Sequence, residues 1–200
     1  MLRTRSKFVA AFVISTMLAG VVAGATLAFV KTRGAAEPPV AALDRAAHPA
    51  TAQPGYAADL RQAVGRWNNE RPSTAPGAPS NPVDLITGIG KASDTLTAFA
   101  TDRGWVCYEV LAAGSCGRVD LTGGVTFSIL STRADGVRLY GVAADYVSAV
   151  EVETEDVWHP AVLRKNGFYY ALPDGRQDSD VQFVRATWTD GSTHLVHVHG

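Results

Sequence analysis

The hydrophobic and polar positions of this chain follow three patterns in turn, and each pattern predicts a different structure. Residues 8–30 contain no charged side chain, and basic residues flank them on both sides. A helix rises about 1.5 Å per residue, so a run of this length reaches roughly 35 Å and can cross a hydrocarbon core of about 30 Å. We therefore expect residues 8–30 to form a transmembrane helix, with residues 1–7 as a cytoplasmic basic tail.

The distribution of basic residues around this run predicts its orientation. Three basic residues precede the apolar run and two follow it. Because the more basic flank stays in the cytoplasm, everything after Lys31 is expected outside, on a cell membrane protein with a single span. A cleaved signal peptide is the alternative, since Ala23-Gly24-Ala25 offers a small-residue cleavage site. The remaining chain reaches the same side either way, anchored in one case and secreted in the other.

Within the apolar run, Gly20 and Gly24 have the Gly-xxx-Gly spacing that lets two membrane helices approach closely. This spacing raises the hypothesis of a weak dimer. Small residues are common in any Ala- and Gly-rich segment, so an ordinary membrane helix is the favoured interpretation.

The second pattern has a helical period. Apolar residues recur every three or four positions from Tyr56 to Trp67. They predict a short amphipathic helix over residues 56–71 that ends at Pro72. This helix either caps the following domain, which we favour, or lies on the membrane surface. The surrounding sequence is rich in Ala and Pro, so residues 31–82 as a whole are predicted to be a linker.

From Leu85 onward, apolar and polar residues alternate, and turn dipeptides separate the alternating segments. Alternation with β-branched and aromatic residues is typical of strands, and short strands joined by hairpin turns are typical of a compact antiparallel sandwich or barrel. We therefore expect residues 83–200 to form a mainly β domain. The expected strands are 95–101 with 105–110, 125–131 with 137–142, 146–153, 162–164 with 168–170, and 181–189 with 193–199.

The charge balance differs between the two parts of the chain. Residues 1–82 contain nine Lys or Arg and four Asp or Glu, whereas residues 83–200 contain nine Lys or Arg and fifteen Asp or Glu. An acidic β-domain repels the phosphate backbone, so nucleic acid is not expected as a partner.

Cys107 and Cys116 are the two cysteines of the chain, and both belong to the β-rich part. An even number of cysteines on the exported side of a membrane predicts a disulfide. The intervening residues are numerous enough to fold back as a hairpin, and closing a loop of about ten residues stabilises a fold by roughly 2.5–3 kcal/mol. A catalytic thiol or a thiolate metal site is the alternative, although the spacing matches neither a zinc knuckle nor Cys-x-x-Cys.

Three histidines close the sequence. On a strand, His197 and His199 share one face and His194 projects from the other. Two imidazoles about 7 Å apart could share a zinc or copper ion, which makes an extracytoplasmic metal-binding protein an alternative function. A structural site needs further ligands, and only His48, His159 and carboxylates remain to supply them. Polar positions on an exposed last strand are therefore the favoured interpretation.

An acidic line of Glu151, Glu153 and Glu155 is expected along one face of a strand. Calcium needs oxygens that converge from loops, so a solvated outer face is favoured over a calcium site. The sequence also lacks a nucleophile-elbow motif and a phosphate-binding loop followed by a helix. We therefore expect neither catalysis nor a cofactor. A hydrolase of unrecognised type, with its site assembled from distant residues, is the remaining alternative.

Residues 95–152 contain the strings Gly-Trp-Val-Cys-Tyr-Glu-Val, Gly-Ser-Cys-Gly and Leu-Tyr-Gly-Val-Ala-Ala-Asp-Tyr-Val. Over residues 85–198 the chain resembles uncharacterised secreted or membrane-anchored β-domain proteins of high-GC Gram-positive bacteria. The resemblance implies an extracytoplasmic setting in bacteria and brings no catalytic residue. Taken with the residue patterns, it leads us to expect a non-enzymatic module that binds an envelope protein or a cell-wall polymer.

Overall fold

The structure, a computed structural model, describes residues 40–44, 54–90, 94–111, 113–133 and 136–198. All of these residues belong to one unit of the chain, Ala35–Gly200. The predicted transmembrane segment, with Gly20 and Gly24, lies outside them. None of the helices in the described ranges combines the length and the apolar character that a membrane crossing needs.

The described residues form two α-helices, one 3-10 turn and twelve strands. In chain order they are α1 (Ala41–Asp44), α2 (Pro54–Glu70), β1 (Val83–Ile89), β2 (Asp94–Ala100), β3 (Val106–Val110), β4 (Ala113–Gly117), β5 (Val125–Thr132), β6 (Gly136–Ala143), β7 (Val147–Thr154), β8 (Val157–Pro160), β9 (Val162–Arg164), β10 (Gly167–Ala171), η1 (Asp178–Asp180), β11 (Val181–Trp188) and β12 (Thr193–His197).

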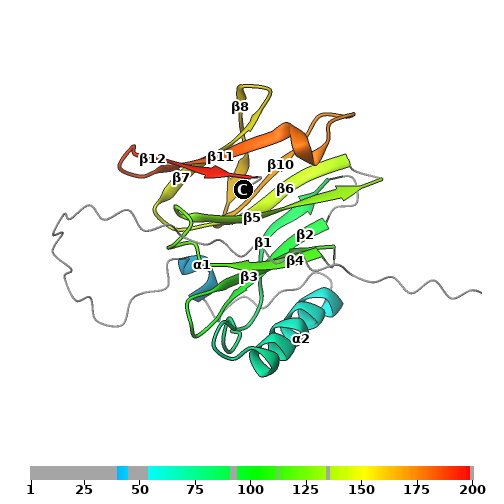
Figure 1. Cartoon of the computed structure of the whole chain (residues 1–200), viewed down its shortest axis with the longest axis vertical. Helices are drawn as coiled ribbons and strands as arrows, with labels where there is room; N and C mark the ends of the chain where they lie inside the picture. The colour runs from blue at the N-terminus through cyan, green and yellow to red at the C-terminus, as the bar shows by residue number, and fades with distance from the viewer. Residues whose placement is uncertain (1–39, 45–53, 91–93, 112, 134–135, 199–200) are drawn as a thin grey trace, which may run out of the picture. The chain divides into compact units, whose positions relative to one another are not determined.

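The strands pair into three four-stranded antiparallel sheets. The first sheet has the order β1-β2-β3-β4, the second β5-β6-β10-β9 and the third β12-β11-β7-β8. Figure 1 shows the second sheet between the other two, with α2 beside the first. The prediction of a mainly β, antiparallel domain is confirmed, and the arrangement is consistent with a sandwich.

The hairpins expected from the turn dipeptides are present as β2–β3, β5–β6, β9–β10 and β11–β12. The sequence did not predict β8, which is four residues long and follows β7 through a tight turn. Glu155 and Asp156 form that turn, with positive φ values of 51° and 61°. Glu155 has therefore left the strand, and the prediction that it shares a strand face with Glu151 and Glu153 is wrong.

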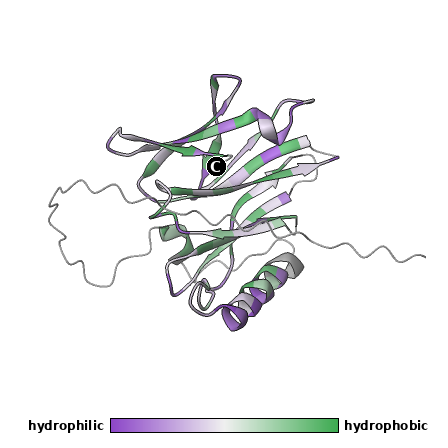
Figure 2. Cartoon of the chain, viewed as in Figure 1, coloured by the Kyte–Doolittle hydropathy of each residue, from purple (hydrophilic) through white to green (hydrophobic). Residues whose placement is uncertain are grey.

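The core fills the space between the sheets, because alternate strand residues point toward the neighbouring layer. Tyr108 of β3 and Tyr140 of β6 meet edge to face there, with ring centroids 6.0 Å apart. The Tyr108 hydroxyl lies 3.3 Å from Oγ of Ser128, and the Tyr140 hydroxyl donates a hydrogen bond to the Ala113 carbonyl at 2.9 Å. In Figure 2 the strands carry most of the hydrophobic residues, whereas much of α2 is hydrophilic.

The helix expected over residues 56–71 is present as α2, and it ends two residues before Pro72. Its Leu60 and Val64 pack on Phe99 and Cys107, on the face of the first sheet that points away from the second. Helix α2 therefore caps the β-domain, as the favoured interpretation predicts.

Two parts of the predicted linker pack into the β-domain. Val40, directly before α1, and Leu43, within it, are 1% and 4% exposed and join the main core. Between α2 and β1, Ala75 is buried and the Pro76 carbonyl accepts a hydrogen bond from Thr101. The linker prediction is wrong for these segments. The Ala- and Pro-rich composition of these segments gives no sign that they pack into the domain, because one or two apolar side chains are enough to anchor a short irregular segment.

Candidate functional site

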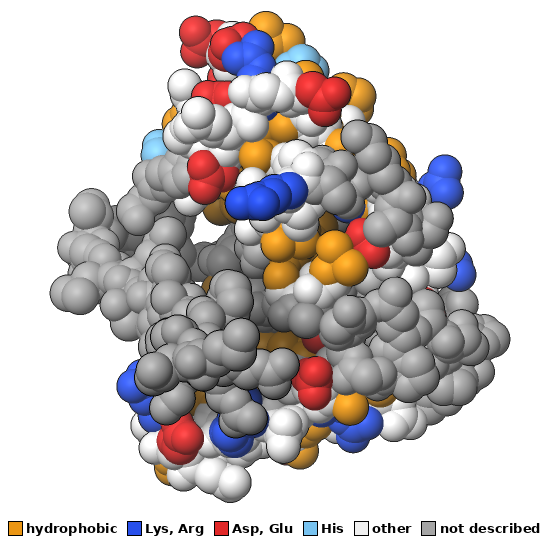
Figure 3. Space-filling view, turned by 90° about the vertical axis from the view of Figure 1, so that its right-hand side faces the viewer, with side chains coloured by type: hydrophobic (Ala, Val, Ile, Leu, Met, Phe, Trp, Pro, Cys, Tyr) orange, Lys and Arg blue, Asp and Glu red, His pale blue; other side chains and the backbone are white. Residues whose placement is uncertain are grey.

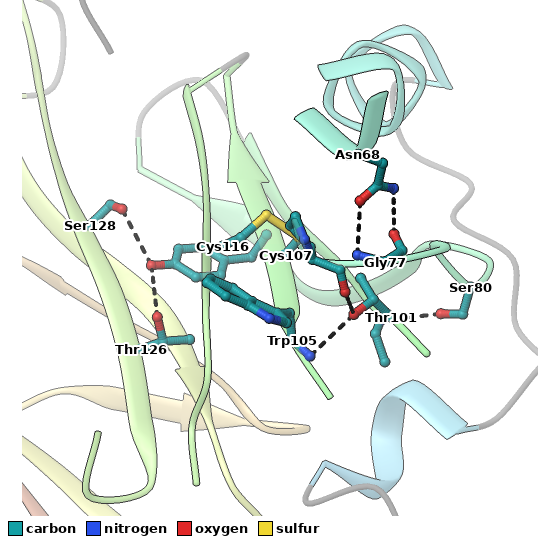
Figure 4. Close-up of a disulfide and its surroundings, with 12 residues drawn as sticks. Asn68, Gly77, Ser80, Thr101, Trp105, Cys107, Cys116, Thr126 and Ser128 are labelled. Carbon is teal, nitrogen blue, oxygen red and sulfur yellow. Dashed lines mark hydrogen bonds between the residues drawn. A yellow bond between two sulfur atoms is a disulfide. The ribbon is translucent and has the colours of Figure 1, made fainter. Parts of the chain in front are cut away.

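The two cysteines lie directly opposite each other on β3 and β4 and form a disulfide, so the predicted pair is confirmed. Figure 4 shows the bond in the seam between the first sheet and α2. Cys107 is fully buried and contacts Val64 of α2 and Phe99 of β2. A sulfur covered in this way is not accessible to a substrate, so the position is that of a structural cross-link.

Polar contacts hold the C-terminal part of α2 in the same seam. The Asn68 side chain donates to the Gly77 carbonyl at 2.8 Å and accepts from the Gly77 amide at 2.9 Å (Figure 4). Gly77 has a φ of +96°, and a Cβ atom there would lie 2.0 Å from Oδ1 of Asp102. The position therefore requires glycine. The two hydrogen bonds from Asn68 hold the segment after α2 against the end of the helix.

Glu109 of β3 is a buried carboxyl group on the same face of the sheet as Cys107. Its side chain is among the buried polar groups, and within the described part of the chain its Oε1 atom has no hydrogen-bond partner. Burial first, and the negative charge of Asp59 on α2 second, raise the pKa of Glu109 to about 7. The sequence carries a signal for this position, because a residue two positions after a buried Cys107 on a strand shares its face.

The histidines at the end of the chain contact aromatic rings. His194 stacks on Trp188, with centroids 6.5 Å apart, and His197 meets Phe183 edge to face at 4.7 Å. The two histidines lie on opposite faces of β12, as expected, and His199 lies outside the described residues. Among the residues that can be described, no group of three or more His, Cys, Asp or Glu side chains could hold a metal ion. The metal site stays a prediction.

The third sheet presents one face on which no described side chain is buried. Strand pairing places alternate residues of its four strands side by side on this face. We call it the outer face, and its residues are Ala149, Glu151, Glu153, Trp158, Pro160, Phe183, Arg185, Thr187, Thr193, Leu195 and His197.

Arg185 occupies the middle of the outer face and is held from two sides. Its guanidinium group lies 2.7 Å from the Glu151 carboxylate and 4.2 Å from the centroid of the Trp158 ring. An arginine that is both ion-paired and stacked on an aromatic ring has lost most of its rotational freedom before any partner arrives. The arrangement therefore presents a planar cation at a fixed position.

Apolar side chains surround this arginine. Phe183 lies two residues before Arg185 on β11. Leu195 of β12 is 54% exposed and pairs with Arg185 across the two strands. Figure 3 shows hydrophobic, acidic, basic and histidine side chains intermixed at the top of the molecule, the end that the third sheet forms in Figure 1. The outer face can thus bury apolar area around one charged anchor.

Comparison of the chain with protein-family models, curated proteins and solved structures found no match. No activity, ligand or partner is therefore carried over to this chain from a relative.

Proposed function

We propose that this protein is a membrane-anchored, extracytoplasmic interaction module without catalytic activity, and that it binds a protein partner through the outer face. The observation that carries the proposal is the fixed Arg185 among the exposed or half-exposed Trp158, Phe183 and Leu195. Aromatic residues and arginine are enriched at the centres of protein interfaces, where they supply most of the binding energy.

The outer face is also built on a rigid support. Arg185 belongs to β11, an inner strand of the third sheet that pairs with β7 on one side and β12 on the other. The ion pair with Glu151 and the contact with Trp158 order the arginine in the free protein. Side chains that are ordered before binding lose less conformational entropy when a partner binds, and the affinity for the partner is therefore higher.

A protein is favoured over a cell-wall polymer as the partner. Sugars bind by stacking on open aromatic rings, whereas the Arg185 guanidinium already occupies one face of the Trp158 ring. A protein surface that packs apolar side chains on Phe183 and Leu195 matches the outer face better. Glu151 already balances the charge of Arg185, so the expected partner surface is apolar at its centre.

Two features support the exported location. Residues 8–30 have the length and the uncharged composition of a membrane span. The disulfide between Cys107 and Cys116 suits an oxidising compartment, because cytosolic thiols are kept reduced.

The proposal is tested by photo-crosslinking of the full chain in its native envelope. A photoreactive amino acid replaces Leu195 on the outer face, and a matched variant carries it at Val162, an exposed residue of β9. A discrete adduct from the Leu195 position alone is expected. The captured protein is then identified and titrated against the wild type and Trp158→Ala. A tenfold or greater loss of affinity, about 1.4 kcal/mol, is expected for Trp158→Ala.

Three outcomes would overturn the proposal. Equal adducts at Leu195 and Val162 would show that the crosslinks do not depend on the outer face. Unchanged affinity of Trp158→Ala would show that this face carries no binding energy. An adduct at the Leu195 position that cell-wall glycan hydrolases degrade would assign the outer face to a polymer.

A further inference from the structure

Helix α2 covers the buried carboxyl group of Glu109. A Cβ atom at Gly114 of β4 would lie 2.8 Å from Cδ1 of Leu60 and 3.4 Å from Cβ of Glu109. Glu109 pairs with Gly114 across β3 and β4 and is 3% exposed. Val64, on the next turn of α2, packs on Cys107, two residues before Glu109. The helix and β3 therefore run in opposite directions, with the first half of the helix over Glu109.

The two halves of α2 are held in different ways. Near its end, Asn68 exchanges two hydrogen bonds with the backbone of Gly77, and Trp67 meets Trp105 edge to face. Figure 4 shows Asn68 at this fixed end of the helix. Earlier in α2, the described packing on the sheet is apolar. The part of the helix around Leu60 can therefore separate from the sheet while Asn68 stays attached.

The groups that face Glu109 from α2, β2 and β4 do not balance a negative charge. The charge of α2 that acts on Glu109 is that of Asp59, which is itself negative. Thr97 of β2 lies opposite Glu109, but its hydroxyl donates to the Asp84 carboxylate at 2.9 Å. Gly114 of β4, on the other side, has no side chain. The neighbouring positions thus supply two carboxylates and a hydroxyl that is already engaged.

The next sheet supplies no counter-charge either. Burial first, and then the charges of Tyr108 and Glu109, raise the pKa of Tyr140 of β6, so this neighbour stays neutral. Its hydroxyl donates a hydrogen bond to a carbonyl of β4. Within the described part of the chain, no lysine or arginine is among the charges that act on Glu109. An ionised Glu109 must therefore obtain its hydrogen bonds from water, and the helix stands between the carboxylate and the solvent.

Movement of the helix is consequently linked to the proton on Glu109. Burial first, and the charge of Asp59 second, raise the pKa of Glu109 from 4.5 to about 7 while the helix is docked. Lifting the helix lets water in and moves Asp59 away, so the pKa returns toward 4.5. Each unit of this difference is worth a factor of ten, so the equilibrium shifts toward the lifted helix on the order of 100-fold as the pH rises from below 4.5 to above 7.

We propose that α2 is a pH-sensitive cover, in which ionisation of Glu109 lifts the part of the helix around Leu60 and Val64 and opens the seam over the Cys107–Cys116 disulfide. The helix stays attached through Asn68. The closed state, which dominates in acid, buries the sulfur of Cys107, and the open state exposes it together with the apolar side chains of the seam. This device belongs to the first sheet and does not depend on the outer face of the third sheet.

The test measures how fast a water-soluble phosphine reduces the disulfide in the full chain. Alkylation of the new thiols, followed by mass measurement, gives the rate for the wild type and for Glu109→Gln at about pH 5 and about pH 8. The ratio of the two rates at one pH removes the pH dependence of the reagent. This ratio, wild type over Gln variant, is expected to rise tenfold or more from about pH 5 to about pH 8. A ratio that does not change with pH would overturn the proposal.

Two further variants separate the charge of Glu109 from the packing around it. Asp59→Lys keeps Glu109 but replaces the repelling charge with an attracting one, and Asp59 is exposed, so the fold should persist. This variant is expected to be reduced more slowly than the wild type at about pH 8. Glu70→Gln, at the exposed end of the same helix, is the matched control and should keep the wild-type rates. Reduction of Asp59→Lys at the wild-type rate or faster would contradict the proposal.

Hydrogen–deuterium exchange distinguishes a lifted helix from unfolding of the whole domain. A lifted helix of this length frays in water, so its amides lose protection. In the wild type at about pH 8, the amides of residues 58–64 are expected to have protection factors at least tenfold below those of β11. Equal protection in α2 and β11 would show that the whole domain opens together, and the proposed cover would then be wrong.

Discussion

Trp67 on α2 and Trp105, directly before β3, lie edge to face with ring centroids 5.7 Å apart and an interplanar angle of 72°. The contact joins the helix to the first sheet beside the buried disulfide, since Val64, one turn earlier on α2, packs on Cys107. Two indoles this close together give a near-ultraviolet circular dichroism signal that depends on their relative orientation. The pair therefore reports whether α2 is docked on the first sheet.

Glu109→Gln is expected to stabilise the protein above about pH 7. Burial, and then the charge of Asp59, raise the pKa of Glu109 from 4.5 to about 7. A carboxyl group with a higher pKa in the folded state contributes its full stability below its unfolded pKa and loses that contribution as the pH rises through its folded pKa. The loss for Glu109 therefore falls between about pH 4.5 and 7. The Gln variant should lack this loss and be more stable than the wild type at about pH 8, by roughly 1–3 kcal/mol.

Urea unfolding at several pH values, followed by tryptophan fluorescence, measures this difference. Asp59→Asn should change the profile in the same direction by a smaller amount, because its charge is the second cause of the shift. Glu70→Gln, on an exposed residue at the end of the same helix, is the matched control and should leave the profile unchanged. A wild type and a Gln variant with parallel pH profiles would show that folding does not raise the pKa of Glu109.

Replacement of both cysteines by alanine is expected to lower the free energy of unfolding by about 2.5–3 kcal/mol, because the unfolded chain gains the entropy of an open loop. Cys107 is also fully buried against Val64, so the docking of α2 should weaken with it. The near-ultraviolet signal of Trp67 and Trp105 should then melt at a lower temperature than the far-ultraviolet signal of the sheets. A double variant as stable as the wild type would contradict the prediction.

Much of the β-domain could be predicted from the sequence, because turn chemistry and strand alternation act locally. Lys165 and Asn166 adopt the positive φ values that a two-residue hairpin turn requires, and the expected β9–β10 hairpin forms around them. The disulfide was predictable for a similar reason, since nine residues of separation and hairpin pairing bring Cys107 and Cys116 together.

The outer face could not be predicted, because it depends on which strands become neighbours. Arg185 and Trp158 are far apart in the sequence and meet only because β7 lies between β11 and β8. The sequence predicts a linker at Val40 and Leu43, because no local pattern shows that a single helical turn inserts into a distant core. Local rules fix the hairpins, whereas the order of hairpins in a sheet is a property of the whole core.

Gly141→Ala and Gly65→Ala are expected to change stability in opposite directions. A Cβ atom at Gly141 of β6 would lie 2.1 Å from the Thr126 carbonyl oxygen and 2.8 Å from Cα of Phe127. Backbone atoms cannot move aside cheaply, so this substitution should cost about 1–3 kcal/mol. Gly65 lies within α2 and has no atom within 4 Å of the added Cβ, so alanine there should stabilise the helix by about 1 kcal/mol. Thermal unfolding of both variants would check the prediction, and a stabilising Gly141→Ala would contradict the packing of β5 on β6.

Asn68→Ala is expected to destabilise the docked helix more than Asn69→Ala, its immediate neighbour. Asn68 exchanges two hydrogen bonds with the backbone of Gly77, so its loss should cost about 1–3 kcal/mol. Asn69 is exposed, and substitution there should change the free energy of unfolding by less than about 0.5 kcal/mol. Because Asn68 is adjacent to Trp67, its variant should also weaken the near-ultraviolet signal of the Trp67 and Trp105 pair below the melting temperature. If both variants kept that signal and the same stability, the hydrogen bonds to Gly77 would not be what holds the end of α2 to the sheet.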